Sequence, residues 1–171
     1  MREVRGERWV PEMRTAIELP VPAYLPESYI PSARAKVDIY RRLQGATRFE
    51  ELEDLRQELQ DRFGELPPVV EDLFALERLR LYGTRLHLLS IGQEGRQVRL
   101  QFSAYLEGVL PEVLTGLASW GRQVTLRGRP RPFLYFTPKD GEPLLPQVEA
   151  LLKDLLQVPA LLQRKKELME A

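Results

Sequence analysis

Cysteine is absent from this chain of 171 residues, and histidine occurs once, as His87. Without cysteine the chain can form no disulfide, thiolate nucleophile or thiolate metal site, and one histidine cannot supply a histidine-rich zinc site. The N-terminal residues are polar and lack the apolar segment of a signal peptide. No stretch approaches the roughly 20 apolar residues that span a bilayer. We therefore expect a cytoplasmic protein with no metal and no membrane association.

The motifs of nucleotide-dependent and hydrolytic enzymes are also absent. The chain contains neither GxxxxGK[ST] nor GxGxxG, so it offers no recognisable site for ATP or a dinucleotide. It contains no Gly-x-Ser-x-Gly nucleophile motif. His87 lies in an apolar stretch with no nearby nucleophile or orienting acid, which favours a structural histidine over a general base. We expect no catalytic residue, no bound cofactor and no enzymatic activity in this chain.

The residues that are present are typical of a folded globular protein. Apolar residues make up 43% of the chain and charged residues 29%, a balance that permits one sizeable core. The 25 basic and 25 acidic side chains cancel. Bulk charge therefore gives no reason to expect nucleic acid or an anionic membrane as the partner.

Helix signals dominate the first half of the sequence. Residues 1–13 show no clear period and predict a linker or tail from a preceding domain, whereas residues 14–171 predict one domain. An alternating stretch over residues 15–20 predicts an edge strand, because its closing proline cannot donate to a ladder. Capping residues and proline positions predict helices over residues 32–45, 47–64 and 67–83.

The hydrophobic period changes in the second half. Short apolar runs bounded by turn residues predict strands over residues 86–91, 97–102, 124–126 and 133–136. Helices are predicted over residues 110–120, 144–156 and 159–169. The expected fold class is α+β, with a helical N-terminal layer followed by a small mixed sheet with flanking helices.

Acidic residues are concentrated in one part of the chain. Residues 47–77 contain ten acidic and three basic side chains, a net charge of −7, so the remainder carries +7. On the helix predicted over residues 47–64, one arc at about 100° per residue is apolar and should face the core: Phe49, Leu52, Leu55, Leu59 and Phe63. A separate acidic stripe lies beside it: Glu51, Asp54, Glu58 and Asp61. With few cations nearby to pair it, this stripe is suited to bind a basic protein surface; the alternative is an ordinary solvated helix face.

Basic residues gather around a Gly/Pro turn in the second half, at Arg122, Arg127, Arg129 and Arg131. Such arginines can reach the phosphates of a nucleic acid. The neighbouring aromatics Tyr135 and Phe136 lie in a predicted strand that the core should claim. The alternative reading is a set of charges that keeps the surface soluble.

A series of motifs runs in order from Ala16 to Ile91. It comprises Ile17-Glu-Leu-Pro20, Leu25-Pro-x-x-Tyr-Ile-Pro31, Tyr40-Arg-Arg-Leu43, Leu52-x-x-Leu55, Glu58-Leu-Gln-Asp-Arg-Phe-Gly64, Leu66-Pro67 and Leu79-Arg80. Each motif alone is weak, but the ordered combination is specific. It resembles the C-terminal domain of the transcription-repair coupling factor family.

The resemblance implies a regulatory role. The parent proteins of the family are ATP- and magnesium-dependent translocases on double-stranded DNA that displace stalled RNA polymerase and recruit the repair protein UvrA. Their C-terminal domain docks on the N-terminal UvrB-like module of the same protein, covers the surface that UvrA binds and restrains the motor. The acidic positions of that contact correspond to Glu58 and Asp61, within the stripe that contains Glu51 and Asp54. The resemblance predicts an autoinhibitory interaction domain; a nucleic-acid-binding module that uses the Arg122–Arg131 region is the alternative.

Overall fold

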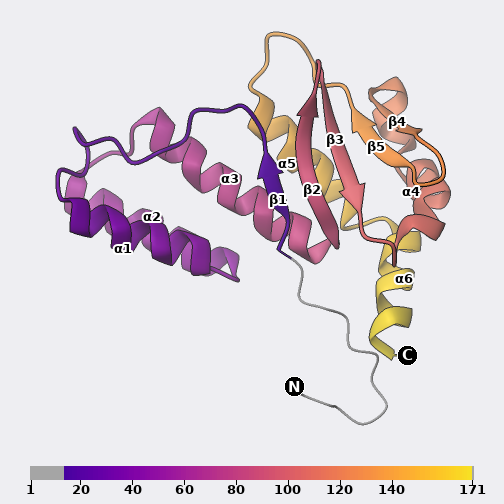
Figure 1. Ribbon diagram of the computed structural model, residues 1–171, viewed down its shortest axis with the longest axis horizontal. Helices are drawn as coiled ribbons and strands as arrows, with labels where there is room; N and C mark the ends of the chain where they lie inside the picture. The colour runs from indigo at the N-terminus through magenta and orange to yellow at the C-terminus, as the bar shows by residue number, and fades with distance from the viewer. Residues whose placement is uncertain (1–13, 171) are drawn as a thin grey trace. The chain divides into compact units, whose positions relative to one another are not determined.

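The computed structural model describes residues 14–170, which form two compact units. Residues 20–81 form a helical unit. Residues 14–19 and 82–170 form a second unit built on a five-stranded sheet (Figure 1). The helix α3 (Pro68–Arg85) supplies its first turns to the helical unit and its last residues to the sheet unit.

The helical unit contains α1 (Ala33–Gly45), α2 (Phe49–Phe63) and the first turns of α3. The side chain of Ser32 caps α1, because its Oγ accepts a hydrogen bond from the Ala35 backbone N–H at 3.2 Å. The helix that the Thr47-Arg-Phe-Glu50 capping-box pattern predicts to begin at Thr47 begins at Phe49, so the box does not form in that register. Glu51 accepts a hydrogen bond from the Thr47 backbone N–H at 3.3 Å, whereas the N-cap position is occupied by Arg48, whose side chain makes no cap hydrogen bond.

A cluster of buried apolar side chains holds the helical unit together. It includes Leu25, Tyr29, Ile30, Ile39, Leu43, Leu52, Leu55, Leu59, Val70 and Phe74. Arg80 is buried beside this cluster at 8% exposure and donates hydrogen bonds to the backbone oxygens of Leu43 and Ala46 at 3.3 and 3.0 Å. The Leu43 oxygen also accepts a hydrogen bond from the Ala46 N–H at 3.3 Å, so Arg80 adds to the capping of the carbonyl groups at the C-terminal end of α1.

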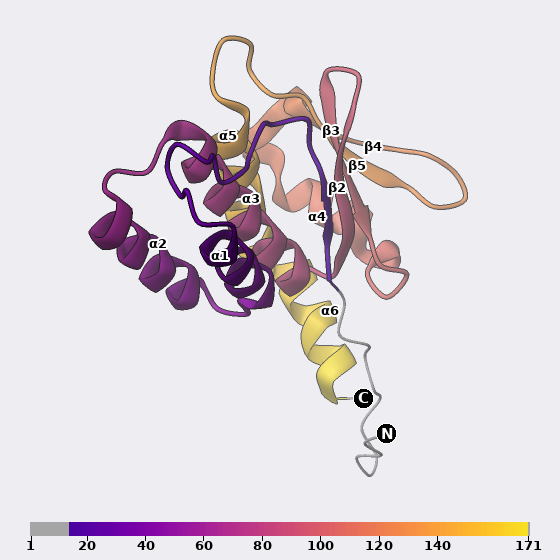
Figure 2. The same ribbon diagram turned by 60° about the vertical axis from the view of Figure 1, so that its left-hand side comes forward.

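The sheet unit has the strand order β1-β2-β3-β5-β4. The strands are β1 (Ala16–Glu18), β2 (Leu88–Glu94), β3 (Gln97–Phe102), β4 (Val124–Arg127) and β5 (Phe133–Phe136). Because β1 pairs with β2 in parallel and all other pairs are antiparallel, the sheet is mixed. Both ribbon views show α5 (Leu144–Leu155) on one face of the sheet (Figure 2). The unit also contains α4 (Leu110–Gly116), α6 (Pro159–Glu170) and two 3-10 segments, Glu107–Val109 and Ala118–Gln123.

A glycine permits β1 to lie against the last turns of α3. The Thr15 hydroxyl, directly before β1, donates a hydrogen bond to the Leu88 backbone oxygen at 2.7 Å. A Cβ atom on Gly83 would lie 2.6 Å from Cγ2 of Thr15, closer than side chains pack. Glycine is therefore required at this close approach.

The structure confirms the α+β class and corrects several boundaries. The helix predicted over residues 110–120 ends as an α-helix at Gly116 and continues as a 3-10 segment, in which Gly121 takes a φ of 57°. The strand predicted from Leu86 begins at Leu88, because His87 adopts a left-handed φ of 54° in the turn after α3. The predicted linker, residues 1–13, lies outside the described residues.

Two substitutions in α2 test the packing of its apolar arc. Leu59 is fully buried at 0% exposure, whereas Phe63 is partly buried and packs at the edge of the cluster. We expect Leu59→Ala to lower the free energy of unfolding by about 2–5 kcal/mol. Phe63→Ala should lower it by less, because part of its ring already contacts solvent. Chemical denaturation of both variants measures the difference, and a larger loss for Phe63→Ala would contradict this placement of the core.

Candidate functional site

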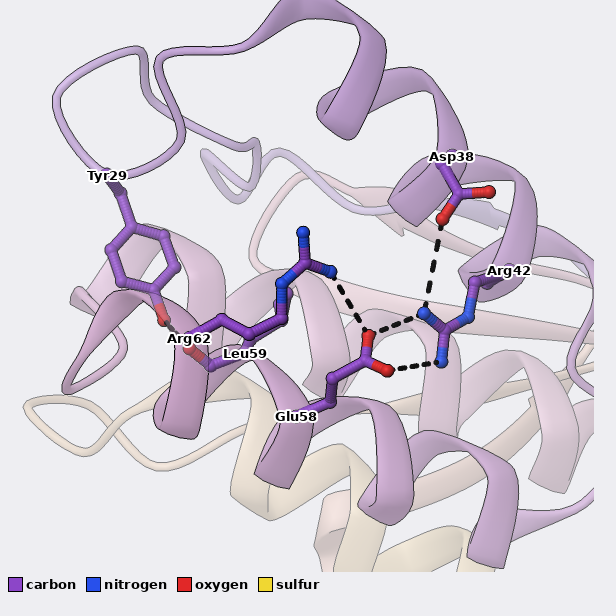
Figure 3. Close-up of polar contacts among 6 residues, drawn as sticks. All are labelled: Tyr29, Asp38, Arg42, Glu58, Leu59 and Arg62. Carbon is purple, nitrogen blue, oxygen red and sulfur yellow. Dashed lines mark hydrogen bonds and ion pairs between the residues drawn. The ribbon is translucent and has the colours of Figure 1, made fainter.

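The C-terminal end of α2 is held in place by Tyr29, the tyrosine of the Leu-Pro-x-x-Tyr-Ile-Pro motif. Its hydroxyl lies 3.2 Å from the Leu59 backbone oxygen (Figure 3). It also lies 2.9 Å from the backbone oxygen of Gly64. Its ring lies 5.8 Å from the ring of Phe63. Gly64 then ends the helix with a φ of 87°, which favours glycine. The last turn of α2, which carries Asp61, is therefore well anchored.

An ion pair between Arg56 and Glu71 joins α2 to α3. The Nε and Nη2 atoms of Arg56 donate hydrogen bonds to the two carboxylate oxygens of Glu71 at 3.0 and 2.5 Å. Two parallel bonds between a guanidinium and a carboxylate fix orientation as well as distance. This pair restrains rotation of α2 about its axis, so the outward direction of the acidic stripe is a property of the folded unit.

Glu58 is paired with arginines of its own unit. Nη1 and Nη2 of Arg42 in α1 lie 2.5 and 3.4 Å from its carboxylate oxygens, and Nη1 of Arg62 lies 3.5 Å away (Figure 3). The hydrogen bond from Arg42 is the main cause that lowers the pKa of the Glu58 carboxyl. The expectation that few internal cations pair the stripe is therefore wrong at Glu58, because α1 packs beside α2 and brings Arg42 to it.

The other three residues of the stripe differ in their surroundings. Glu51 accepts a hydrogen bond from Nε of Arg48 at 3.1 Å, and this contact is the main cause that lowers its pKa. Asp61 is exposed and accepts a hydrogen bond at 3.0 Å from the neutral Gln57, which does not offset its charge. Asp54 is exposed and borders a shallow hollow of about 410 Å³. That hollow is also lined by Arg42, Gly45, Glu51 and Leu55.

The structure therefore places the four predicted stripe residues on one side of α2, here called its outer side, with Asp54 and Asp61 exposed and Glu51 and Glu58 half-buried. It adds Arg42 of α1, which sequence reasoning missed. A signal was available, since α1 is basic and contains the Arg-Arg pair of the Tyr40-Arg-Arg-Leu43 motif. The helical period cannot show that α1 packs beside α2, so this signal could not assign either arginine to Glu58.

The four arginines of the second half lie in or beside the β4–β5 hairpin. Arg122 is in the 3-10 segment before β4, Arg127 ends β4, and Arg129 and Arg131 are exposed in the turn. The guanidinium carbon of Arg127 lies 3.9 Å from the centroid of the Tyr135 ring. A cation on an aromatic face is attracted by the ring's charge distribution, so Arg127 is engaged within the sheet.

Other contacts around the hairpin are also internal. Arg127 donates a hydrogen bond to Gln97, and Nε of Arg131 lies 3.9 Å from a carboxylate oxygen of Glu107. Tyr135 is 7% exposed and Phe136 is fully buried, which confirms the expectation that the core claims these aromatics. Arg122 and Arg129 are therefore exposed to a nucleic acid, whereas the rings of Tyr135 and Phe136 on β5 are not available to stack on its bases.

His87 lies in the turn between α3 and β2. Its backbone N–H donates to the Thr84 oxygen at 3.2 Å, and its own oxygen accepts from the Ser103 N–H at 2.9 Å. Burial, and next the positive charge of Lys165, lower the pKa of His87. Within residues 14–170, no three His, Cys, Asp or Glu side chains are placed to hold a metal ion. No helix in this range is both long and apolar enough to cross a membrane.

Comparisons with known proteins agree with the order of motifs. The family model of the TRCF domain matches residues 19–107, more than half of the chain. The transcription-repair-coupling factor of Bacillus subtilis (strain 168) is 35% identical over 92 residues, which cover 54% of this chain and 8% of that protein. The one from Myxococcus xanthus is 29% identical over 157 residues, covering 90% of this chain and 13% of that protein.

A solved structure shares the fold. The crystal structure of a C-terminal domain of transcription-repair coupling factor superposes with a TM-score of 0.69 at 23% identity, covering 91% of this chain and 97% of that one. The chain belongs to the TRCF domain family, the family of the C-terminal domain of transcription-repair coupling factors. It spans a small part of the length of its relatives, 8% and 13% for the two described above.

Removing the arginine beside Glu58 tests the pair directly. Arg42→Gln deletes the main cause of the lowered pKa, so we expect the Glu58 carboxyl to titrate at a higher pH than in the parent chain. Because the folded pKa is depressed, the pair contributes stability above the unfolded pKa and loses it as pH falls through the folded pKa. Carbon NMR of the Glu58 carboxyl follows the titration, with Arg41→Gln as the control. Identical titration of all three proteins would show that the contact does not form.

Proposed function

We propose that this chain is an autoinhibitory docking domain of a transcription-repair coupling factor. The outer side of α2 binds arginines on the UvrB-like module of the same protein and thereby masks the surface that UvrA recognises. The observation that carries the proposal is the presentation of Glu58 and Asp61 one helical turn apart on the anchored outer side of α2. The position of these two residues in the TRCF motif series supports the same conclusion.

The proposed mechanism is competition between an intramolecular partner and UvrA. A module linked to its partner in one chain has a high effective concentration, so modest contact energies keep the two docked. When the motor engages stalled RNA polymerase on DNA, its rearrangement favours the undocked state, and UvrA gains access. ATP hydrolysis belongs to the other domains of the parent, and this chain contributes the releasable contact.

The anchored helix suits this role energetically. A pair of exposed charges contributes about 0–1 kcal/mol, whereas truncating one side of a desolvated pair at an interface costs about 2–5 kcal/mol. The acidic side chains lie on a helix whose orientation is already set by Tyr29 and by the Arg56–Glu71 pair. Docking therefore orders few additional groups, which lowers the entropy cost of association.

A double substitution in the stripe tests the proposal. Glu58→Ala with Asp61→Ala should leave folding nearly intact, because neither side chain belongs to the buried cluster. In the full-length coupling factor the same pair should weaken docking, so that UvrA binds more tightly, with the largest change at low salt. The measurement is a UvrA binding titration with full-length proteins, alongside melting curves of the isolated chain.

Glu50→Ala with Glu53→Ala is the matched control, since it removes the same charge from exposed positions of the same helix outside the stripe. UvrA affinity that rises in the stripe variant and not in the control supports the proposed role. Equal UvrA affinity of the parent protein and the stripe variant, with equal melting curves, would refute it.

A further inference from the structure

The charges around Glu58 cancel within the domain. Arg42 and Arg62 both approach Oε2 of its carboxylate, at 2.5 and 3.5 Å, and Asp38 lies 4.0 Å from Nη1 of Arg42. These two arginines and two carboxylates sum to zero. An incoming cation therefore meets two positive groups beside Glu58, and like charges at this range repel.

Asp61 differs from Glu58 in this respect. Its carboxylate accepts a hydrogen bond from the neutral amide of Gln57, and its side chain is exposed. A basic partner can approach Asp61 without displacing a cation from that bond. Of the two residues that the proposed function assigns to docking, Glu58 is the one whose contact requires an exchange of partners.

We propose that Arg42 is an internal competitor for the docking partner. This inference rests on the proposed function. A cation of the basic partner module replaces Arg42 on the Glu58 carboxylate, so the Arg42–Glu58 pair sets how strongly the domain docks. Arg42 is a positioning residue in the undocked state, since it holds Glu58 against α1.

The surroundings of Arg42 make this exchange feasible. Its side chain is 41% exposed, and that of Glu58 is 38% exposed, so the guanidinium can leave without opening the buried cluster. Asp38 is one turn earlier on α1 and is 55% exposed, which gives the displaced guanidinium a nearby carboxylate. An exposed ion pair contributes little free energy. Replacing Arg42 by a cation of the partner therefore costs little, and the Arg42–Glu58 pair can re-form when the partner leaves.

The neighbouring residue Arg41 provides a matched control. It is exposed on the same helix, and its replacement by glutamine removes the same charge as Arg42→Gln. A gain in affinity that came only from the lower net charge of the chain would appear in both variants. A gain that came from freeing Glu58 would appear only in Arg42→Gln and would vanish when Glu58 is also replaced.

The test is a calorimetric titration of the 171-residue chain with the UvrB-like module of its parent protein at low ionic strength. We expect Arg42→Gln to bind about two- to fivefold more tightly than the parent chain, the range that an exposed ion pair covers. Arg41→Gln should bind with little change. In the Glu58→Gln background, adding Arg42→Gln should give no gain.

The outcomes separate the two proposals. If Glu58→Gln and Asp61→Asn both bind as the parent chain does, the proposed function fails. If Glu58→Gln weakens binding but Arg42→Gln binds no more tightly than Arg41→Gln, the docking surface stands and the competitor role of Arg42 is refuted. Weaker binding by Arg42→Gln, with an unchanged melting curve, would also refute it, because Arg42 would then orient Glu58 for the partner. Melting curves of all variants identify any that fail to fold.

Discussion

The burial of three leucines on α2 is the constraint on which the rest of the candidate site depends. Leu52, Leu55 and Leu59 are each 2% exposed or less, and they lie on one arc of the helix. A helix that buries one arc must present the opposite arc to solvent. This packing leaves Asp54 and Asp61 exposed and places Glu51 and Glu58, half-buried, beside the apolar arc, where Glu58 contacts Arg42 of α1. Tyr29 and the Arg56–Glu71 pair then fix the end and the rotation of the helix.

The stripe is not a uniform anionic surface. Glu58 is paired with Arg42 and Arg62. Asp61 accepts a hydrogen bond from the neutral Gln57, which does not compensate its charge. In the proposed docking surface, the unpaired charge of Asp61 is suited to steer a basic partner. The charge of Glu58 becomes available to that partner only after Arg42 has been displaced. In the proposed docking, such a contact would be weak enough to be released and would select a partner that supplies a cation at this position.

Periodicity and turn signals were sufficient to predict the helices, the fold class and the buried leucines of α2, although the capping pattern at Thr47 did not locate the first residue of α2. They were sufficient because these properties depend on residues close together in the sequence. Arg42 and Glu58 are 16 residues apart and meet only because α1 packs beside α2. The parallel pairing of β1 with β2, more than 70 residues later, is likewise a tertiary feature that no local pattern contains. The need for glycine at position 116 is tertiary for the same reason, because a Cβ atom there would lie 2.8 Å from Cγ1 of Val158.

The central claim is that the outer side of α2 is the docking surface, and amide NMR tests it most directly. The isotopically labelled chain would be titrated with the UvrB-like module, and the perturbed backbone amides would be mapped onto the helical unit. The account predicts that the largest perturbations fall on residues 51–61 of α2 and on the end of α1 near Arg42. Perturbations confined to the β4–β5 hairpin around residues 127–131, with α2 unchanged, would contradict it.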